Sequence, residues 1–412
     1  MKSRRRSQNP QFPSHIIETI LSKLSFFILL NLRPVCKAWN NLILTSKLLN
    51  LNSKANLFAH ITPYQKLYCI DFDSKILKEG KKNCIVRSFT FHPRFFTFKM
   101  VNSCNGLFCF VNTEMISDQC EKKSFGLKQP LAIILNPMTN EELSLNNSLK
   151  FYPGSSFGFG YSPNKKQYKI VKLSLIKIPH LRSSYVASHL RSSYVAEIFT
   201  IGKFARGRHG KWRQNRVPAV RVLWSFGVYL NGSLYWKAYN TTRIRANAVL
   251  LRFDVEDEKF EVVSFPQVVR DDAFLISSNI WIFNNTLYVS YFDSKIDMGS
   301  FHVWKMMEED YSWVKLEQKF AIMKSIKDHF SLMMVSYIRD YMIRCHFQLI
   351  KVFEDETMLF LISQRALILY DSKIDQFEAV HDELNQDQDG KLCIHEIDSL
   401  NFDSLAKTLG VN

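Results

Sequence analysis

From Lys54 onward the chain repeats a two-part β pattern, which limits its fold more than any other feature of the sequence. One part is a Gly- or Asn-containing turn that leads into an aromatic strand, as in CNGLFCFV from residue 104 and LNGSLYWKA from residue 230. The other part is a pair of apolar strands around an Asp- or Asn-rich turn, as in LRFDVEDEKFEVVSF from residue 251 and LILYDSKIDQFEAV from residue 367. The two parts alternate at intervals of about fifty to seventy residues, close to the blade periods of β-propellers.

This alternation predicts a mainly β fold in which each pair of parts supplies one four-stranded blade. About six blades fit the length, and a closed ring of blades leaves few exposed strand edges. We expect the hairpin YCIDFDSKILKE, from residue 68, to share a blade with strands from the C-terminal end of the chain and so to close the ring. A β-sandwich is the alternative, but it accounts less well for the regular alternation.

The segment from Phe12 to Leu51 has a different pattern, with apolar residues at helical spacing. Three helices fit it, and Pro34 suits the first position of the third helix. Cys36 lies beside the apolar face of that helix and no histidine partner is apparent, so we expect it to pack as a small hydrophobic residue rather than to react. Three helices in roughly forty residues bury too little surface to be stable alone. The segment therefore needs a partner.

The helical stretch FPSHIIETILSKLSFFILLNLRPVCKAWNNLI resembles an F-box. The resemblance implies that these helices dock onto the small adaptor subunit of an SCF-type cullin-RING ubiquitin ligase. The residues implied to bind the adaptor are Pro13, Ile16, Ile17, Ile20, Leu21, Leu24, Leu29, Leu30, Val35, Cys36 and Trp39.

The β region is similar to the F-box-associated, kelch-like interaction domain of plant F-box proteins. The matching segments, which occur in the family's order, are SCNGLFCF, ILNPMTNE, FGFGYSPNKKQYKIVKL, GVYLNGSLYWKA, LLRFDVEDEKFEVVSFP and HVWKMMEEDYSWVKL. We therefore expect a disordered basic tail at 1–11, an F-box at 12–53, an F-box-associated β-propeller-like domain at 54–400 and a C-terminal tail at 401–412.

These resemblances imply a non-catalytic substrate-recognition subunit, which binds the adaptor through the F-box and an unknown target protein through the β domain. Two alternatives stay open. One is a β-propeller protein-binding module that has lost its association with the ligase, and the other is a calcium-binding protein that uses a single EF-hand-like loop.

The calcium alternative rests on NQDQDGKLCIHE, which has the ligand spacing of an EF-hand loop. Its oxygen donors would be Asn385, Asp387, Asp389 and Glu396. An apolar strand pair precedes the loop where an EF-hand has a helix, and the chain contains no second loop. We therefore favour no metal and expect the last strand of the ring at this place.

A basic stretch from Gly202 to Arg221 contains no acidic residue, in a chain of net charge +16. It suits recognition of phosphate or of an acidic peptide, through Lys203, Arg206, Arg208, Lys211, Arg213 and Arg216. We favour a solvated loop between blade strands, with Trp212 packing at the start of a strand. No nucleic-acid-binding fold accompanies the stretch, so we expect no nucleic-acid partner.

The sequence HLRSSYVA occurs twice, from His180 to Ala187 and from His189 to Ala196. A strand that spanned both copies would exchange its two faces, because the repeat unit has an odd length. We therefore expect a strand from Tyr194 to Phe199 and a loop for the first copy.

Catalytic and targeting motifs are missing from the sequence. The eight cysteines form no CxxC pair, the histidines have no metal-ligand spacing, and there is no GxSxG, P-loop or dinucleotide fingerprint. We expect no cofactor and no enzymatic activity. The apolar runs are too short to cross a membrane, so we expect no membrane association and a location in the cytoplasm and nucleus.

Overall fold

The structure is a computed structural model of the 412-residue chain. It describes residues 13–24, 28–29, 32–45, 56–62, 66–70, 85–90, 98–112, 130–137, 139, 141–145, 155–176, 193–202, 210, 212–223, 226–240, 247–266, 278–283, 285–293, 300–316, 347–352, 357–362, 366–371, 373–374, 376–379 and 391–397. The chain divides into two compact units, Met1–Asn56 and Leu57–Asn412. Each unit is described by itself.

The N-terminal unit is helical. Helix α1 covers Ser14–Leu21 and begins directly after Pro13, whose carbonyl accepts hydrogen bonds from the backbone N–H groups of Ile16 and Ile17 at 2.9 and 3.3 Å. Helix α3 covers Lys37–Thr45, and residues 28 and 29 between them are also helical. Three fully buried side chains, Leu21, Leu29 and Ile43, come from these three segments. They form the described core of the helical unit.

The second unit consists of antiparallel sheets, which we call blades 1 to 6. Blade 1 contains β1 (Asn56–Thr62), β2 (Lys66–Ile70), β3 (Ile85–Thr90) and β25 (Lys391–Ile397), and blade 2 contains β4 (Phe98–Cys104), β5 (Leu107–Asn112), β6 (Ala132–Asn136) and β7 (Glu141–Leu145). Blade 3 contains β8 (Ser156–Ser162), β9 (Gln167–Ile176), β10 (Ser193–Ile201) and β11 (Arg213–Arg216). Blade 4 contains β12 (Val220–Val222), β13 (Val228–Leu230), β14 (Ser233–Asn240), β15 (Asn247–Asp254) and β16 (Lys259–Ser264). Blade 5 contains β17 (Asn279–Phe283), β18 (Thr286–Asp293), β19 (Ser300–Met306) and β20 (Trp313–Leu316), and blade 6 contains β21 (Phe347–Val352), β22 (Thr357–Ile362), β23 (Ala366–Asp371) and β24 (Gln376–Ala379).

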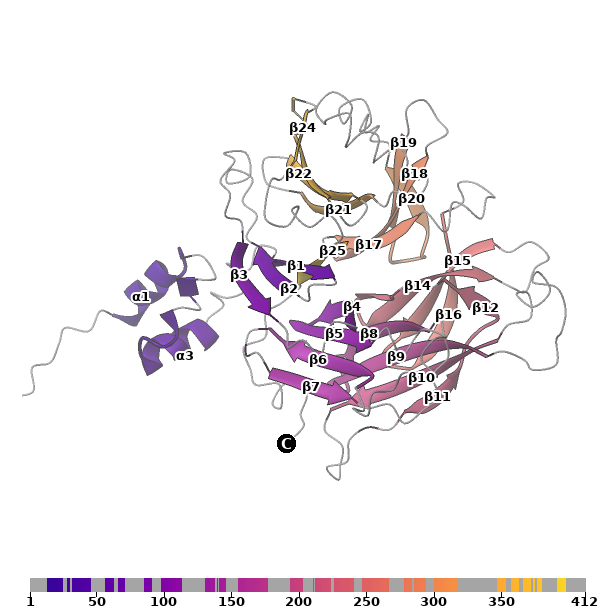
Figure 1. Cartoon of the computed structure of the whole chain (residues 1–412), viewed down its shortest axis with the longest axis horizontal. Coiled ribbons are helices and arrows are strands. Elements are labelled where there is room, and N and C mark those ends of the chain that lie inside the picture. The colour runs from indigo at the N-terminus through magenta and orange to yellow at the C-terminus, as the bar shows by residue number, and fades with distance from the viewer. Residues whose placement is uncertain are drawn as a thin grey trace, which may run out of the picture. The chain divides into compact units, whose positions relative to one another are not determined.

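The blades have a propeller-like arrangement (Figure 1). Inner strands contact one another from blade to blade: β25 lies against β4, β4 against β8, β8 against β13, β13 against β17, and β17 against β21. Strand β25, from the C-terminal part of the chain, is the neighbour of β1 in blade 1. This pairing confirms that the start of the YCIDFDSKILKE segment, in β2, shares a blade with a C-terminal strand, while residues 71–79 of the segment lie outside the described residues.

The two parts of the sequence pattern correspond to the two halves of a blade. In blade 4, the turn–strand part forms β13 and β14, and the hairpin part forms β15 and β16. Two-residue Asn-Gly turns join the inner strands of blades 2 and 4, with positive φ at Asn105 (48°), Gly106 (73°), Asn231 (44°) and Gly232 (77°). A hairpin turn of this type needs positive φ at both central residues, and Asn and Gly tolerate it best.

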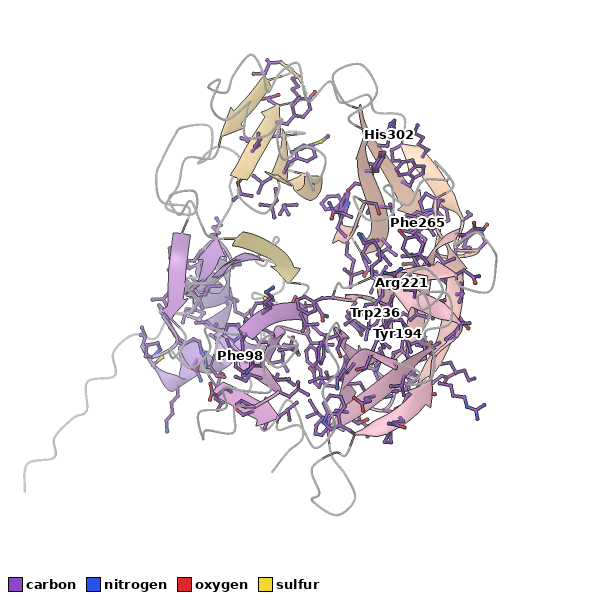
Figure 2. All side chains as sticks on the ribbon, turned by 45° about the vertical axis from the view of Figure 1, so that its right-hand side comes forward. Phe98, Tyr194, Arg221, Trp236, Phe265 and His302 are labelled. Carbon is purple, nitrogen blue, oxygen red and sulfur yellow. The ribbon has the colours of Figure 1, made fainter. Side chains whose placement is uncertain are left out.

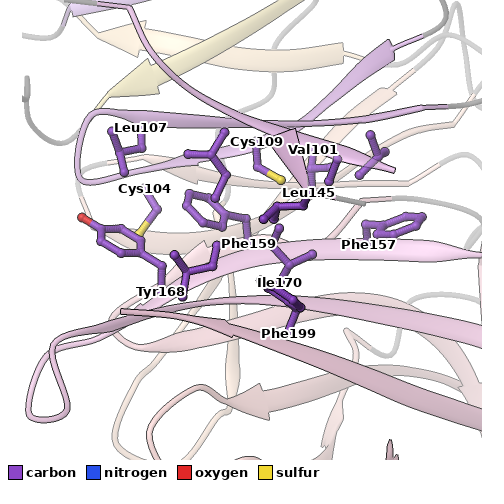
Figure 3. Packing of buried hydrophobic residues seen from close by; sticks show 14 of the residues in the cluster. Val101, Cys104, Leu107, Cys109, Leu145, Phe157, Phe159, Tyr168, Ile170 and Phe199 are labelled. Atoms are coloured by element: carbon purple, nitrogen blue, oxygen red, sulfur yellow. The ribbon is translucent and has the colours of Figure 1, made fainter. Parts of the chain in front are cut away.

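Strand β8 holds blades 2, 3 and 4 together. On the blade 2 side, the amide of the Asn102 side chain makes both hydrogen bonds that a neighbouring strand would make to Phe159. Its Nδ2 donates to the carbonyl of Phe159 at 2.6 Å, and its Oδ1 accepts from the N–H of Phe159 at 3.0 Å. Around this contact Val101, Cys109 and Leu145 of blade 2 pack in one cluster with aromatic residues of β8 (Figure 3).

On the blade 4 side, β8 has two glycines because large side chains of blade 4 lie against its backbone. A Cβ atom on Gly158 would lie 2.6 Å from Cζ2 of Trp236, and one on Gly160 would lie 2.9 Å from Cδ2 of Tyr229. Trp236 is fully buried (Figure 2) and donates from Nε1 to the carbonyl of Phe157 at 3.2 Å. The FGFG sequence therefore provides the room that brings blades 3 and 4 together.

We predict that Gly158→Ala lowers the free energy of unfolding by about 1–3 kcal/mol, because the added methyl group overpacks against Trp236. Replacing the indole by a smaller ring should relieve the clash, so the same substitution should cost much less in a Trp236→Phe background. Urea unfolding of the four proteins of this double-mutant cycle measures the coupling. An equal cost of Gly158→Ala in both backgrounds would show that this contact does not determine the packing.

Charged side chains are also buried between and within the blades. Lys172 and Glu197, on paired positions of β9 and β10, form an ion pair at 2.9 Å with both side chains almost fully buried. Lys237 of β14 is buried as well and donates from Nζ to the carbonyl of Ser278 at 2.5 Å. Burial lowers the pKa of Lys237 from 10.5 to about 8, because a buried ammonium loses its hydration.

This shift predicts a pH-dependent stability. Below about pH 8 Lys237 is charged in both the folded and the unfolded state, so folding carries the full cost of burying the ammonium. Between pH 8 and 10.5 the folded state binds fewer protons at Lys237 than the unfolded state does. The free energy of unfolding therefore rises with pH over this range. Relative to Lys237→Met, the wild-type chain should gain stability over this range, on the order of 3 kcal/mol. Urea unfolding of both chains from pH 7 to 10.5 tests it, and a constant difference between them would contradict it.

The structure also answers two smaller predictions. Strand β10 begins at Ser193, so the second copy of the repeat forms the expected strand, while the first copy lies outside the described residues. Pro34, which we expected at the first helical position, lies in a turn instead, and α3 begins at Lys37. The physical reason is that Cys36 caps the helix, because its carbonyl accepts the first helical hydrogen bond, from the N–H of Asn40.

Candidate functional site

The helical unit exposes large apolar side chains. Ile20 is 54% exposed and Val35 is 59% exposed, and Ile16 and Ile28 are also exposed. Ile16 and Ile20 are four residues apart on α1 and so lie on the same side of that helix. We call these four residues the apolar set. Single exposed hydrophobic residues are ordinary in proteins, but four of them between residues 16 and 35 make this unit a candidate for binding another protein.

The residues implied to bind the adaptor have two different roles in the structure. Ile16, Ile20 and Val35 belong to the apolar set, and Pro13 and Cys36 are exposed beside them in the sequence. The partly buried residues are Ile17, Leu24 and Trp39; the fully buried ones are Leu21 and Leu29; Leu30 lies outside the described residues. The helical spacing of the sequence identified the apolar residues but did not separate the core from the surface.

Ile28 belongs to the apolar set but is not among the residues that the resemblance implied to bind the adaptor. It precedes the buried Leu29 in a run of apolar residues, FFILL, where the chain gives no polar residue to mark which side chains face solvent. One feature of the sequence could have indicated that Ile28 is exposed. It directly precedes the core residue Leu29 in a helical segment, and neighbouring helical residues point in different directions.

Cys36 caps helix α3. Its carbonyl accepts the first helical hydrogen bond, from the N–H of Asn40 at 3.0 Å, and its Sγ accepts from the N–H of Trp39 at 3.4 Å. The side chain is exposed and does not pack within the unit, unlike the small hydrophobic residue we expected. A further hydrogen bond joins Arg33 to the helix, since its Nε donates to Oδ1 of Asn40 at 3.0 Å. These contacts fix the start of α3 just after Val35.

We predict that Cys36→Ser strengthens this cap, because a hydroxyl oxygen accepts a backbone hydrogen bond better than a thiol does. Cys36→Ala removes the acceptor and should weaken the helix start by about 0.5–1 kcal/mol. Amide hydrogen exchange at Trp39 and Asn40 in the intact chain should be slower in the serine variant and faster in the alanine variant. The same rates in both variants would exclude a capping role.

The basic stretch gives a different result from the expectation. Arg213 is bound within the protein: a guanidinium nitrogen lies 2.5 Å from Oε1 of Glu258 and 2.9 Å from Oγ1 of Thr200. The guanidinium is thus paired between blades 3 and 4, while its side chain stays half exposed, and its part in a recognition patch stays a prediction. Arg216 is exposed, and the other members of the patch, Lys203, Arg206, Arg208 and Lys211, lie outside the described residues.

Trp212 packs at the start of strand β11, as predicted. Its ring lies against Phe199, with ring centroids 5.3 Å apart and planes at 50°. It belongs to the partly buried residues at the edge of the cluster between blades 2 and 3. It is therefore part of the fold rather than a platform on which a nucleic-acid base could stack.

Arg213 belongs to a polar network between blades 3 and 4. Lys169 of β9 also contacts Oε1 of Glu258, at 2.9 Å, and Ser162 donates to the Glu256 carboxylate. Burial lowers the pKa of Lys169, while the Glu258 carboxylate opposes that shift. The hydrogen bond from Ser162 keeps the pKa of Glu256 below its usual range. Basic side chains of blade 3 are thus neutralised by the acidic turn after β15.

The calcium loop is not supported at its described end. Glu396 lies in strand β25, where an EF-hand would begin its second helix. Asn385, Asp387 and Asp389 lie outside the described residues. Within the described ranges no group of three His, Cys, Asp or Glu side chains is placed to hold a metal ion. None of the described helices has both the length and the apolar character to cross a membrane.

Comparison with known protein families accounts for both units. The description "F-box domain" matches residues 10–51, and "F-box associated beta propeller domain" matches residues 65–345. The chain belongs to the F-box-associated β-propeller family. The F-box match covers the helices that carry the apolar set, and the propeller match begins just before β2 and extends to just before β21.

The relatives are F-box proteins of Arabidopsis thaliana. "F-box protein At3g07870" is 26% identical over 274 residues, which is 62% of this chain and 60% of that protein, and "F-box protein At5g65850" is 25% identical over 259 residues, 62% of this chain and 56% of that protein. "F-box/LRR-repeat/kelch-repeat protein At2g27520" is 24% identical over 315 residues, 74% of this chain and 75% of that protein. The chain thus spans less than two thirds of the first two relatives.

Proposed function

We propose that this F-box protein is the substrate-recognition subunit of an SCF-type cullin-RING ubiquitin ligase. In this proposal the helical unit binds the adaptor subunit and the propeller binds a target protein. The observation that supports it best is the apolar set, because these exposed side chains lie within the F-box match.

The energetics of the helical unit favour docking. Its described core has three fully buried hydrophobic residues, whereas the apolar set leaves four in contact with water. Burying an exposed aliphatic side chain contributes roughly 1.5–3 kcal/mol. A partner that covers Ile20 and Val35 therefore stabilises the complex and the helical unit together. The cap at Cys36 holds Val35 in a fixed position at the start of α3 and so reduces the entropy cost of binding.

The propeller's part in this proposal is to hold the target. It supplies no catalytic group, and the reaction is accelerated because target lysines are kept at a high effective concentration near the ubiquitin to be transferred. A ring of blades with buried cross-blade contacts suits this role, since a rigid scaffold holds a bound target in a fixed orientation.

We predict that Ile20→Asp weakens binding of the adaptor subunit by at least tenfold, because it places a charge where an apolar side chain must lose its water. Isothermal titration of the intact chain with the purified adaptor measures the effect. Ile374→Asp is the matched control: Ile374 is exposed to a similar degree, but it lies between β23 and β24 of blade 6. It should bind the adaptor as the wild-type chain does.

The proposal fails if the wild-type chain does not bind the adaptor, or if both variants bind it equally well. In the first case the chain would be a propeller binding module without ligase association. Far-UV circular dichroism of both variants shows whether the helices are retained, so that a loss of binding is not mistaken for unfolding.

A further inference from the structure

The outer strand of blade 5 differs from β7, β11 and β16, the other outer strands whose side-chain exposure the structure describes. In β20, Val314 is 47% exposed and Leu316 is 38% exposed. The outer strands β7 and β11 expose only polar or charged side chains, which are Glu142, Ser144, Arg213, Gln214 and Arg216. Strand β16 exposes one valine among charged and polar residues. Charged outer strands prevent unwanted pairing between sheets, and β20 lacks this protection on one face.

The main chain of β20 offers hydrogen-bonding groups outward. The N–H of Met307 donates to the carbonyl of Ser312 at 2.9 Å, just before the strand begins. Pairs in an antiparallel ladder alternate between bonded and non-bonded, so the pairs Lys305–Val314 and Val303–Leu316 are of the bonded kind. The N–H and C=O groups of Trp313 and Lys315 therefore point away from β19. No described strand lies beyond β20 in its sheet.

The two exposed apolar side chains lie on one face of β20, because they are two residues apart. An added strand would place its own alternate side chains beside Val314 and Leu316. Its main chain would bond to Trp313 and Lys315. Such addition of a strand is an established way of binding extended peptides, in which main-chain bonds supply affinity and alternate side chains supply specificity.

The turn before β20 defines the charge of the partner. Glu308, Glu309 and Asp310 are all exposed there. Asn231 donates to Glu308 at 2.9 Å. The N–H of Ser312 donates to Asp310 at 2.9 Å, and the hydrogen bonds from Ser312 hold the pKa of Asp310 below its usual range. An antiparallel partner would bring the residues that follow its apolar positions to this turn. Basic residues at that end complement the acidic turn.

We propose that the edge of β20 binds an extended segment of the target protein, with apolar residues at alternate positions followed by basic residues. This inference rests on the proposed substrate-recognition function, and it assigns a site and a partner chemistry to the propeller. The segment adds a fifth strand to blade 5, antiparallel to β20.

The test uses the peptide acetyl-Ile-Thr-Val-Thr-Lys-Lys-amide as the probe and the intact chain as the receptor. The wild-type chain should bind it and should bind the version with two glutamates in place of the lysines more weakly. Val314→Thr keeps the strand propensity and should weaken binding about tenfold, because an apolar contact is lost. Fluorescence anisotropy of the labelled probe measures both.

Lys315→Pro is the most specific variant. It removes an N–H that only an added strand would use, and proline is tolerated on an edge strand when its missing N–H faces solvent. It should abolish probe binding, whereas Lys315→Ala, which keeps the N–H, should retain most of it. Equal binding by the proline and alanine variants would overturn the proposal, as would absence of probe binding to the wild-type chain.

Two further readouts separate the remaining outcomes. In the free chain the amides of Trp313 and Lys315 should exchange with solvent much faster than those of Val314 and Leu316, and slow exchange at all four would show that the edge is already occupied and overturn the proposal. Self-association that Lys315→Pro removes would identify a second copy as the occupant and overturn it too. The wild-type chain and every β20 variant should bind the adaptor equally. Failure of the wild-type chain to bind the adaptor would count against the proposed function, whereas loss of adaptor binding in a β20 variant alone would overturn this site.

Discussion

The close approach of blade 4 to strand β8 is the contact on which the described part of the propeller depends. Gly158 and Gly160 leave room for Trp236 and Tyr229, and no larger residue fits there. On its other side β8 is bound by Asn102, whose amide pairs with both polar groups of Phe159. Packing and hydrogen bonding thus act on one strand from two directions. The consequence is a fixed register between three successive blades, which a surface-binding scaffold requires.

The sequence predicted the fold well because the fold is repetitive. Alternating turn–strand and hairpin parts identified the blades, and the position of the YCIDFDSKILKE segment indicated that its blade also contains a C-terminal strand. What it could not show were contacts between residues distant in the chain. Lys169 and Arg213 appear in the sequence as basic residues for solvent, yet they share Glu258, a residue of the next blade. Similarly, nothing beside Asn102 in the sequence shows that its partner is Phe159.

The candidate site was predicted by resemblance more than by local physics. Helical spacing marks both Leu21 and Ile20 as apolar, although Leu21 is buried and Ile20 is exposed. Both residues lie near the edge of the apolar face of α1, where only the packing of the folded unit decides which side chain is covered. Cys36 was expected to pack as a small hydrophobic residue, but in the structure it is exposed and caps helix α3. The EF-hand spacing shows that a ligand pattern can fall on a strand, since Glu396 lies in β25, where the last strand of the ring was expected.

We propose that the helical unit binds the adaptor while the propeller remains free for a target. Hydrogen–deuterium exchange of the intact chain, with and without saturating adaptor subunit, tests this most directly. We predict slower exchange in α1, at residues 28 and 29 and around the start of α3, and unchanged exchange in blades 2 to 6. Protection spread over the propeller strands, or no protection in the helices, would contradict it.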